Sequence, residues 1–164
     1  MGTTVTNSGQ NSSGLNSGLK PPKLIGRYRV LGRIGHGGMA TVYLGRADGP
    51  SGFERLVAIK LLHEHLSSEK NVVEMFMEEA KVAARIRHPN VVPVIEIGET
   101  DGRYFLVMEY INGDSLLTVI ARSWKTKQTF PFPIAAYLMI GASDGLHAAH
   151  ELVGPNGESL GVVH

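Results

Sequence analysis

The stretch Ile34-Gly35-His36-Gly37-Gly38-Met39-Ala40-Thr41-Val42-Tyr43 packs three glycines into four residues and then turns to strand-forming residues. Glycines let a backbone approach a ligand closely and point its N–H groups at phosphate oxygens. In a dinucleotide-binding fold such a loop opens a helix, whereas here it opens a β-branched and aromatic run. No Gly-Lys-Ser/Thr follows, which excludes a Walker-type phosphate loop. The stretch therefore predicts a glycine-rich turn between two strands of a hairpin.

A lysine ends the next strand-like run, Leu56–Lys60. Strand side chains alternate, so Lys60 shares a face with the small Ala58, while Val57 and Ile59 point the other way. A small residue beside a lysine leaves room for a flat ligand with the ammonium group at its far end. The alternative is an edge-strand lysine that discourages aggregation.

An amphipathic helix is predicted from about residue 68 to 87, ended by His88-Pro89, because the residue before proline is pushed out of the helical region. At about 100° per residue, Glu79 falls inside the apolar arc of this helix. A carboxylate that faces a core is costly unless it is paired. We therefore expect Lys60 to meet Glu79; the alternative is a loosely packed helix on which Glu79 stays hydrated.

The remaining pattern is that of an α+β protein. A five-stranded antiparallel sheet with one helix inserted after its third strand is expected to be followed by further helices. The predicted strands are 28–31, 41–44, 56–60, 91–97 and 104–110, the later helices are 115–122 and 133–152, and a short strand closes the chain at 160–163.

Composition excludes several classes of protein. The chain has 164 residues, 43% of them hydrophobic, and a formal net charge of +1, which gives no excess charge for binding nucleic acid or an anionic membrane. The absence of cysteine excludes a disulfide framework and a thiolate metal site, and it fits a cytoplasmic protein. The most apolar stretch, 134–142, is too short to span a bilayer. Residues 1–23 are polar and Gly/Ser-rich, so we expect a disordered tail.

Taken together, these features resemble the amino-terminal lobe of a eukaryotic-like serine/threonine protein kinase, and bacterial members in particular. The resemblance is carried in order by residues 34–43, Val57-Ala58-Ile59-Lys60, Glu79 and His88-Pro89-Asn90-Val91-Val92. It covers about residues 28–164 and implies a protein-kinase-like fold, with an N-lobe at 24–111 and a partial helical C-lobe at 112–164.

The resemblance also implies ATP and Mg²⁺ as cofactors and protein serine or threonine as the substrate. Lys60, positioned by Glu79, would hold the α and β phosphates, and these two are the implied catalytic residues. Met108 would be the gatekeeper, and the backbones of Glu109 and Ile111 would bond the adenine edge. The implied nucleotide-binding residues are Ile34, Gly35, His36, Gly37, Gly38, Met39, Ala40, Thr41, Val42, Ala58, Lys60, Met108, Glu109, Ile111, Asp114 and Ser115. Asp114 or Ser115 would reach the ribose; equally, these residues would cap the helix that follows.

Phosphoryl transfer needs a catalytic-loop Asp, an Asn and the Asp of Asp-Phe-Gly. None of Asp48, Asp101, Asp114 and Asp144 stands in such a motif. Residues 160–164 resemble the approach to the family's His-Arg-Asp, with His164 in the place of its His, so the catalytic Asp would come two positions later. We therefore expect no activity from this chain alone and no metal site in it; the alternative is a non-catalytic module that binds a nucleotide or a partner.

Two pairs of histidines remain. His147 and His150 are spaced to share a helical face, but no carboxylate motif or cysteine accompanies them as a further metal ligand. The same argument applies to His63 and His65, which we expect to be exposed. The apolar 133–152 helix is typical of a helix buried on all sides, so we expect the isolated chain to expose an apolar patch and to be poorly soluble or oligomeric.

Overall fold

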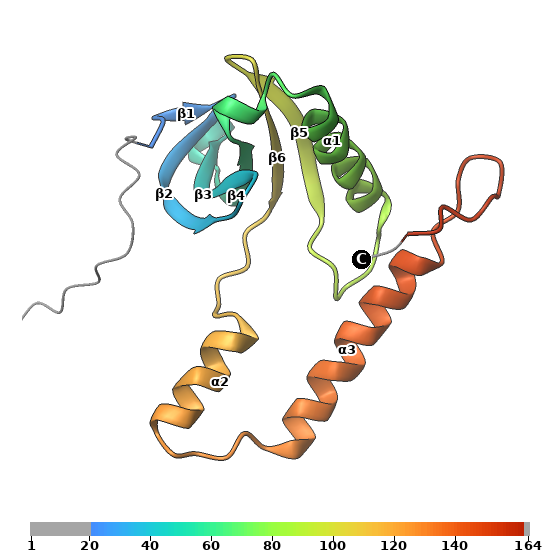
Figure 1. Cartoon of the computed structure of the whole chain (residues 1–164). Helices are drawn as coiled ribbons and strands as arrows, with labels where there is room; N and C mark the ends of the chain where they lie inside the picture. The colour runs from blue at the N-terminus through green and yellow to red at the C-terminus, as the bar shows by residue number, and fades with distance from the viewer. Residues whose placement is uncertain (1–20, 163–164) are drawn as a thin grey trace, which may run out of the picture.

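A curled antiparallel sheet with one helix beside it forms the upper part of the molecule, and two further helices hang below it (Figure 1). The computed structural model describes residues 21–162. Its strands are β1 (Leu24–Ile25), β2 (Tyr28–His36), β3 (Ala40–Asp48), β4 (Glu54–Leu62), β5 (Val94–Thr100) and β6 (Arg103–Glu109). Its α-helices are α1 (Lys70–Arg85), α2 (Leu116–Lys125) and α3 (Phe132–His150), with short 3₁₀ turns η1 (Pro50–Gly52) and η2 (Glu64–Leu66).

The sheet has six strands in the order β1-β2-β3-β4-β6-β5, one more than the five expected. The additional strand, β1, is a two-residue segment that pairs with the start of β2. So short a segment carries no alternating pattern, which is why its sequence reads as a loop. The α+β architecture, the antiparallel pairing and the single helix between the third and fourth predicted strands are confirmed.

Side-chain alternation along β4 divides the core into two clusters, one on each face of the sheet. Val57, Ile59 and Leu61 are each at most 1% exposed and pack with Phe105 and Val107 of β6. On the other face, a second cluster joins the sheet to α1. The predicted division of β4 into two faces is confirmed, and it leaves Ala58 and Lys60 on the α1 side.

Helix α1 docks on the sheet through Phe76 and Ala80, which pack with Leu62 and Leu106. The helix is shorter at both ends than the predicted range of 68–87. At its start, the carbonyl of Glu69 accepts the N–H groups of residues 72 and 73, which makes Glu69 the cap instead of a helical residue. At its end, Ile86 is already extended, three residues before Pro89.

A polar contact fastens the start of the sheet to its far edge. Tyr28 is 1% exposed, and its hydroxyl donates to the Glu96 carboxylate at 2.6 Å. Arg27 donates to the same carboxylate oxygen at 2.7 Å. Burial raises the pKa of Tyr28, and the bond to Glu96 adds to that rise. A buried hydroxyl with a charged partner is satisfied, so this contact holds the curl of the sheet in one arrangement.

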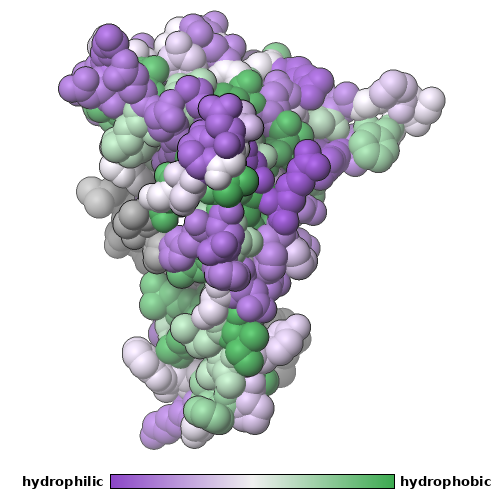
Figure 2. Space-filling model, turned by 90° about the vertical axis from the view of Figure 1, so that its right-hand side faces the viewer, coloured by the Kyte–Doolittle hydropathy of each residue, from purple (hydrophilic) through white to green (hydrophobic). Residues whose placement is uncertain are grey.

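The two lower helices are much less buried than the sheet. Helix α2 buries none of its residues, and α3 buries only Gly145 and Ala149. Green, hydrophobic residues cover much of this lower part in Figure 2. Helix α3 contacts the segment between α1 and β5, where Gly145 meets the main chain of Asn90. A Cβ at Gly145 would lie 3.1 Å from the Asn90 carbonyl oxygen.

The predicted closing strand at 160–163 is wrong for its described residues, 160–162. A turn brings Val153 opposite Ser159 in a single bridge, and the Leu160 N–H returns to the Leu152 carbonyl. Gly161 then takes a φ of +55°, which no extended strand accommodates. Most of the predicted tail (residues 1–20) and the terminal pair Val163 and His164 lie outside the described residues.

No helix within residues 21–162 is long and apolar enough to cross a membrane.

Candidate nucleotide site

The predicted contact between Lys60 and Glu79 forms. Lys60 Nζ lies 2.6 Å from Glu79 Oε1, which joins the end of β4 to the middle of α1. The ammonium group also lies 5.6 Å from the ring centroid of Phe76, within range of a cation–π contact. One strand and one helix therefore fix the position of this amine.

The predicted burial of Glu79 is wrong. Its side chain is 52% exposed, whereas that of Lys60 is 21% exposed. The helix packs through Phe76 and Ala80, and Glu79 lies at the margin of that contact instead of inside it. No desolvation cost therefore forces the pair together, and an exposed ion pair of this kind contributes little stability, about 0–1 kcal/mol.

Strand register places small and branched residues beside the lysine. Val42 lies directly opposite Lys60 across the β3–β4 ladder, and Leu44 lies opposite Ala58. Across the β4–β6 ladder, Ala58 lies opposite Met108. Directly opposed residues share a face of a sheet, so Val42, Ala58 and Met108 line the same face as Lys60.

The glycine stretch forms the β2–β3 hairpin, as predicted, and the Gly37 N–H donates to the Ala40 carbonyl at 2.9 Å to close its tip. Packing does not account for these glycines. A Cβ at Gly38 would meet nothing within 4 Å, and one at Gly35 would make only ordinary contact with Val42. Glycines elsewhere in the sheet do have a packing reason, because a Cβ at Gly45 or Gly98 would overlap a buried side chain. The open space at the hairpin is available for a group outside the chain.

The side chains of the hairpin divide between the two faces of the sheet. His36 and Thr41 are opposed in the β2–β3 ladder, and Thr41 is only 6% exposed on the face away from Lys60. Only their main chain can therefore contact a ligand beside Lys60. Ile34 is 49% exposed, Ala40 is buried in the cluster that α1 covers, and Met39 packs against that cluster.

The segment after β6 runs from Glu109 to the start of α2. The Glu109 N–H donates to the Pro93 carbonyl at 3.1 Å, so any contact of Glu109 with an adenine goes through its carbonyl oxygen. Ile111 follows in an exposed, irregular stretch, with 60% of its surface accessible.

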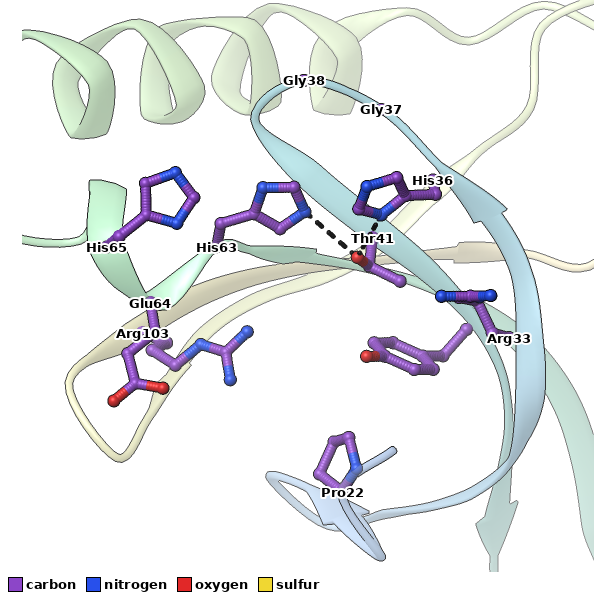
Figure 3. A pocket seen from close by; sticks show the side chains of 11 residues that line it. Pro22, Arg33, His36, Gly37, Gly38, Thr41, His63, Glu64, His65 and Arg103 are labelled. Carbon is purple, nitrogen blue, oxygen red and sulfur yellow. Dashed lines mark hydrogen bonds between the residues drawn. The ribbon is translucent and has the colours of Figure 1, made fainter. Parts of the chain in front are cut away.

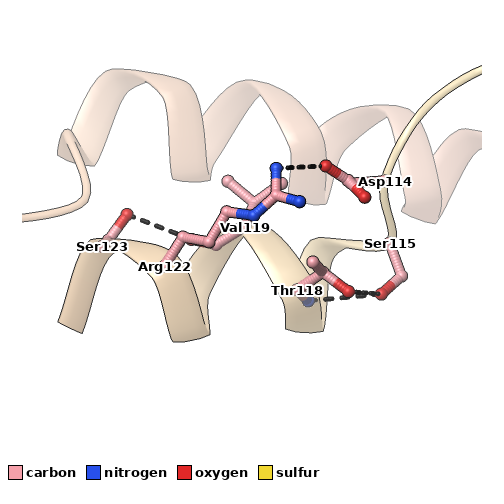
Figure 4. Close-up of polar contacts among 6 residues, drawn as sticks. All are labelled: Asp114, Ser115, Thr118, Val119, Arg122 and Ser123. Atoms are coloured by element: carbon pink, nitrogen blue, oxygen red, sulfur yellow. Dashed lines mark hydrogen bonds and ion pairs between the residues drawn. The ribbon is translucent and has the colours of Figure 1, made fainter. Parts of the chain in front are cut away.

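Asp114 and Ser115 make different contacts, although they are neighbours in the chain (Figure 4). The Ser115 hydroxyl accepts the Thr118 N–H at 3.2 Å and so caps α2, as one of the two sequence interpretations expected. Asp114 does not cap the helix; its carboxylate binds the Arg122 guanidinium at 2.5 Å. Both side chains remain at least partly exposed beside the segment that follows β6.

The sequence interpretation treated His63 and His65 as an exposed pair, and for His63 this is wrong. His63 is half-buried, its Nε2 lies 3.1 Å from Thr41 Oγ1, and its ring stacks on His36 with 5.0 Å between centroids. Burial lowers the pKa of His63, and the neighbouring His36 and His65 rings lower it further. The position of His63 directly after a buried strand was the sequence signal that could have predicted its partial burial.

Candidate metal ligands are sparse. Asp48 binds Arg46 at 2.8 Å, Asp101 occupies the β5–β6 turn with a φ of +50°, and Asp144 belongs to α3. Within residues 21–162, no three histidine, cysteine, aspartate or glutamate side chains form a group that could hold a metal ion.

Comparisons with known proteins identify the family of the chain. Residues 28–153 match the protein kinase domain family. The tyrosine-protein kinase MasK of Myxococcus xanthus is 38% identical over 139 residues, which are 85% of this chain and 22% of MasK. The serine/threonine-protein kinase pkn2 of the same organism is 37% identical over 135 residues, 81% of this chain and 15% of pkn2.

A likeness in three dimensions supports the same assignment. The crystal structure of the Mycobacterium tuberculosis PknI kinase domain aligns with a TM-score of 0.61 and 26% identity, over 84% of this chain and 52% of that domain. The chain thus spans about half of the solved kinase domain and 22% or less of the two curated relatives. Its resemblance to bacterial serine/threonine kinases is confirmed. The chain belongs to the protein kinase family and corresponds to the amino-terminal part of the catalytic domain.

Proposed function

We propose that this chain is the ATP-binding part of a protein kinase that transfers the γ-phosphate of ATP to serine or threonine side chains of proteins. The observation that carries the proposal is the Lys60–Glu79 ion pair, at 2.6 Å, on the face that Val42 and Ala58 line. An amine held in this way is positioned for the α and β phosphates, and the small Ala58 leaves room for the adenine.

The glycine hairpin would cover the phosphates. Because Gly38 has free space where a Cβ would stand, the backbone N–H groups of the hairpin tip can approach an oxygen closely. The Glu109 carbonyl and the Ile111 backbone would bond the adenine edge, with Met108 beside it as the gatekeeper. Asp114 would bond the ribose once it exchanges its Arg122 partner for a sugar hydroxyl.

Transfer itself would need groups that this chain does not hold. No aspartate here stands in a catalytic-loop or Asp-Phe-Gly motif. Magnesium, when bound, neutralises the charge that develops on the phosphates. We therefore propose weak nucleotide binding and no phosphoryl transfer by the 164-residue chain alone, within a protein that works in the cytoplasm.

Titration of the full chain with a fluorescent ATP analogue tests the assignment. Lys60→Met should weaken binding by about tenfold, because a charge-assisted contact to phosphate is lost. Lys125→Met, at an exposed lysine of α2, is the matched control and should bind as the unaltered chain does. Equal affinity of the Lys60 variant and the control would refute the assigned site.

The acceptor residue needs a separate test, because one relative is named a tyrosine kinase and another a serine/threonine kinase. Phosphoamino-acid analysis of a protein phosphorylated by the complete catalytic domain distinguishes them, and phosphoserine or phosphothreonine is expected.

The second candidate is a non-catalytic module that binds a nucleotide or a partner. Reading the gene beyond the codon for His164 separates the two. An Arg-Asp followed by an Asn and by Asp-Phe-Gly supports the kinase, and a stop codon supports the module.

A further inference from the structure

A pocket lies behind the glycine hairpin, on the face of the sheet away from Lys60. Its volume is about 640 Å³, and it lies between the ends of β2, β3 and β4 and the start of β6 (Figure 3). We call it the histidine pocket and define it by Arg33, His36, Thr41, His63, His65 and Arg103. Thr41 and Val42 are neighbours in β3 and so face opposite sides of the sheet. The side chains of the histidine pocket therefore lie on the other face from Lys60, and the two sites meet only at the hairpin tip, where Gly37 and Gly38 also line the pocket.

The lining of the histidine pocket is cationic. Arg33 and Arg103 face one acidic residue, Glu64, and among residues 21–162 no carboxylate lies within ion-pair distance of either arginine. Unpaired arginines that converge on one hollow favour an anion. The three histidines add ring N–H groups that can donate to an anion.

Arg103 is held in a fixed orientation. Its Nε and one terminal nitrogen both donate to the Leu62 carbonyl, at 3.1 and 2.9 Å. A guanidinium group has five N–H donors, so the others remain for a ligand. Figure 3 shows the Arg103 side chain reaching into the hollow from one side and Arg33 standing on the other.

Thr41 ties two of the histidines together. Its hydroxyl oxygen lies 3.1 Å from His36 Nδ1 and 3.1 Å from His63 Nε2. The hydroxyl has one proton, so it donates to one ring while the other ring donates to its oxygen. In either arrangement, one of the two neutral rings carries an N–H on its remaining nitrogen. Protonation of the rings makes both remaining nitrogens donors.

The groups that shift the pKa of His63 indicate that the pocket lacks an anion to balance its cations. Burial, His36 and His65 all lower the pKa of His63, with Arg103 acting in the same direction, and only the Gly38 backbone opposes them. The nearby Glu64 and Tyr43 complete the titratable groups that line the pocket. An anion among these groups would offset the repulsion between cations and would favour the protonated ring.

We propose that the histidine pocket binds the phosphate group of a phosphate monoester. Arg33 and Arg103 would pair with the phosphate oxygens from two sides, and the histidine N–H groups would complete the contacts. The pocket is larger than a phosphate ion needs, and Tyr43 and Pro22 supply an uncharged wall for the organic part of the ester. A phosphorylated side chain and a small phosphorylated metabolite share this chemistry.

Calorimetric titration of the full chain with phenyl phosphate tests the proposal, in a Lys60→Met background so that the proposed nucleotide site does not contribute. Saturable binding is expected, because Arg33 and Arg103 stay charged and can pair with the phosphate oxygens. Arg33→Gln and His65→Gln should each weaken binding about tenfold, since each removes a charge-assisted contact. Both residues are exposed, so both variants should fold.

Arg55→Gln is the matched control, because it removes the same charge from an exposed position on β4 outside the pocket. Its affinity for phenyl phosphate should equal that of the parent. In the parent, the His63 pKa measured by NMR should rise on saturation. Absence of saturable binding, or an equal loss in the Arg55 control, overturns the proposal without bearing on ATP binding at Lys60.

A second arm of the titration distinguishes the sources of the phosphate. A peptide of residues 12–22 phosphorylated at Ser17 comes from the chain that leads to Pro22 at the pocket, and its sequence holds no acidic residue of its own. Tighter binding of this peptide than of phenyl phosphate supports a phosphorylated segment of the protein as the ligand. Binding of phenyl phosphate alone supports a small phosphate ester.

Discussion

The sheet with α1 and the pair of lower helices are both rich in apolar residues, but they use them differently. In the upper half, side chains such as Ile59, Phe76 and Val107 are at most 1% exposed. In the lower half, Leu117, Trp124 and Tyr137 are each 77% exposed. The upper half therefore carries its own core, whereas the lower helices present the apolar surface that a larger helical lobe would cover.

The largest expected consequence of this difference is self-association. Exposed apolar faces on α2 and α3 should make the isolated chain oligomeric, because contiguous apolar patches are rare on monomers. The double variant Leu117→Lys, Tyr137→Lys should shift it towards the monomer in light scattering. Phe53→Lys, at a 65% exposed residue of the upper half, is the control and should leave association unchanged. A sharply melting monomer of the unaltered chain would contradict this expectation.

Replacing a phenylalanine with alanine should lower stability much more in the sheet than in the lower helices. Phe105→Ala removes a ring that is 2% exposed and should lower the free energy of unfolding by about 3–5 kcal/mol. Phe132→Ala removes a ring that is 82% exposed and should change it by less than about 0.5 kcal/mol. Urea unfolding followed by circular dichroism, in the lysine double variant to limit association, measures both. Similar losses would mean that α3 is packed as tightly as the sheet.

Two glycines of the sheet distinguish a glycine that packing requires from one that leaves room for a ligand. Gly98→Ala places a Cβ against the buried Phe105 ring and should cost about 1–3 kcal/mol, because a packed core tolerates added atoms poorly. Gly38→Ala meets no atom within 4 Å and should change stability by less than about 0.5 kcal/mol. Thermal unfolding compares the two variants. A large loss at Gly38 would give the hairpin glycines a structural role and weaken the argument for a phosphate cover.

The sequence was most informative where one physical rule acts alone. Alternation along residues 56–60 predicted which side chains of β4 share a face, and the glycine hairpin followed from the strand-like residues after it. The contact of Lys60 with Glu79 was also predicted, but the reason offered for it, a buried carboxylate, was wrong. Helical periodicity gives the direction of a side chain and not how far the neighbouring sheet extends over it.

The histidine pocket could not be predicted, because its members come from four separate strands or strand ends. His36 and Thr41 are brought together by the register of one hairpin, and His63 joins them only because β4 ends beside β3. Single residues at such distances in sequence leave no periodic signal. His63 and His65 were for the same reason expected to be exposed, and His36 and Thr41 were assigned to the nucleotide-binding hairpin.

The smallest expected effect concerns the pH dependence that His63 gives to the upper half. Its pKa is lowered in the folded chain from the ordinary 6.5, so the unfolded state binds the proton more readily. Stability from this group is therefore fully present above about pH 6.5 and is lost as the pH falls below it. Urea unfolding in phosphate-free buffer should show a free energy that declines from about pH 7 to pH 5. His63→Gln should flatten part of that decline, while His147→Gln, on the exposed surface of α3, should keep it. Stability that rises with acid, or a slope unaffected by His63→Gln, would show that the stacked imidazoles do not repel a proton and would place the acid sensitivity elsewhere in the chain.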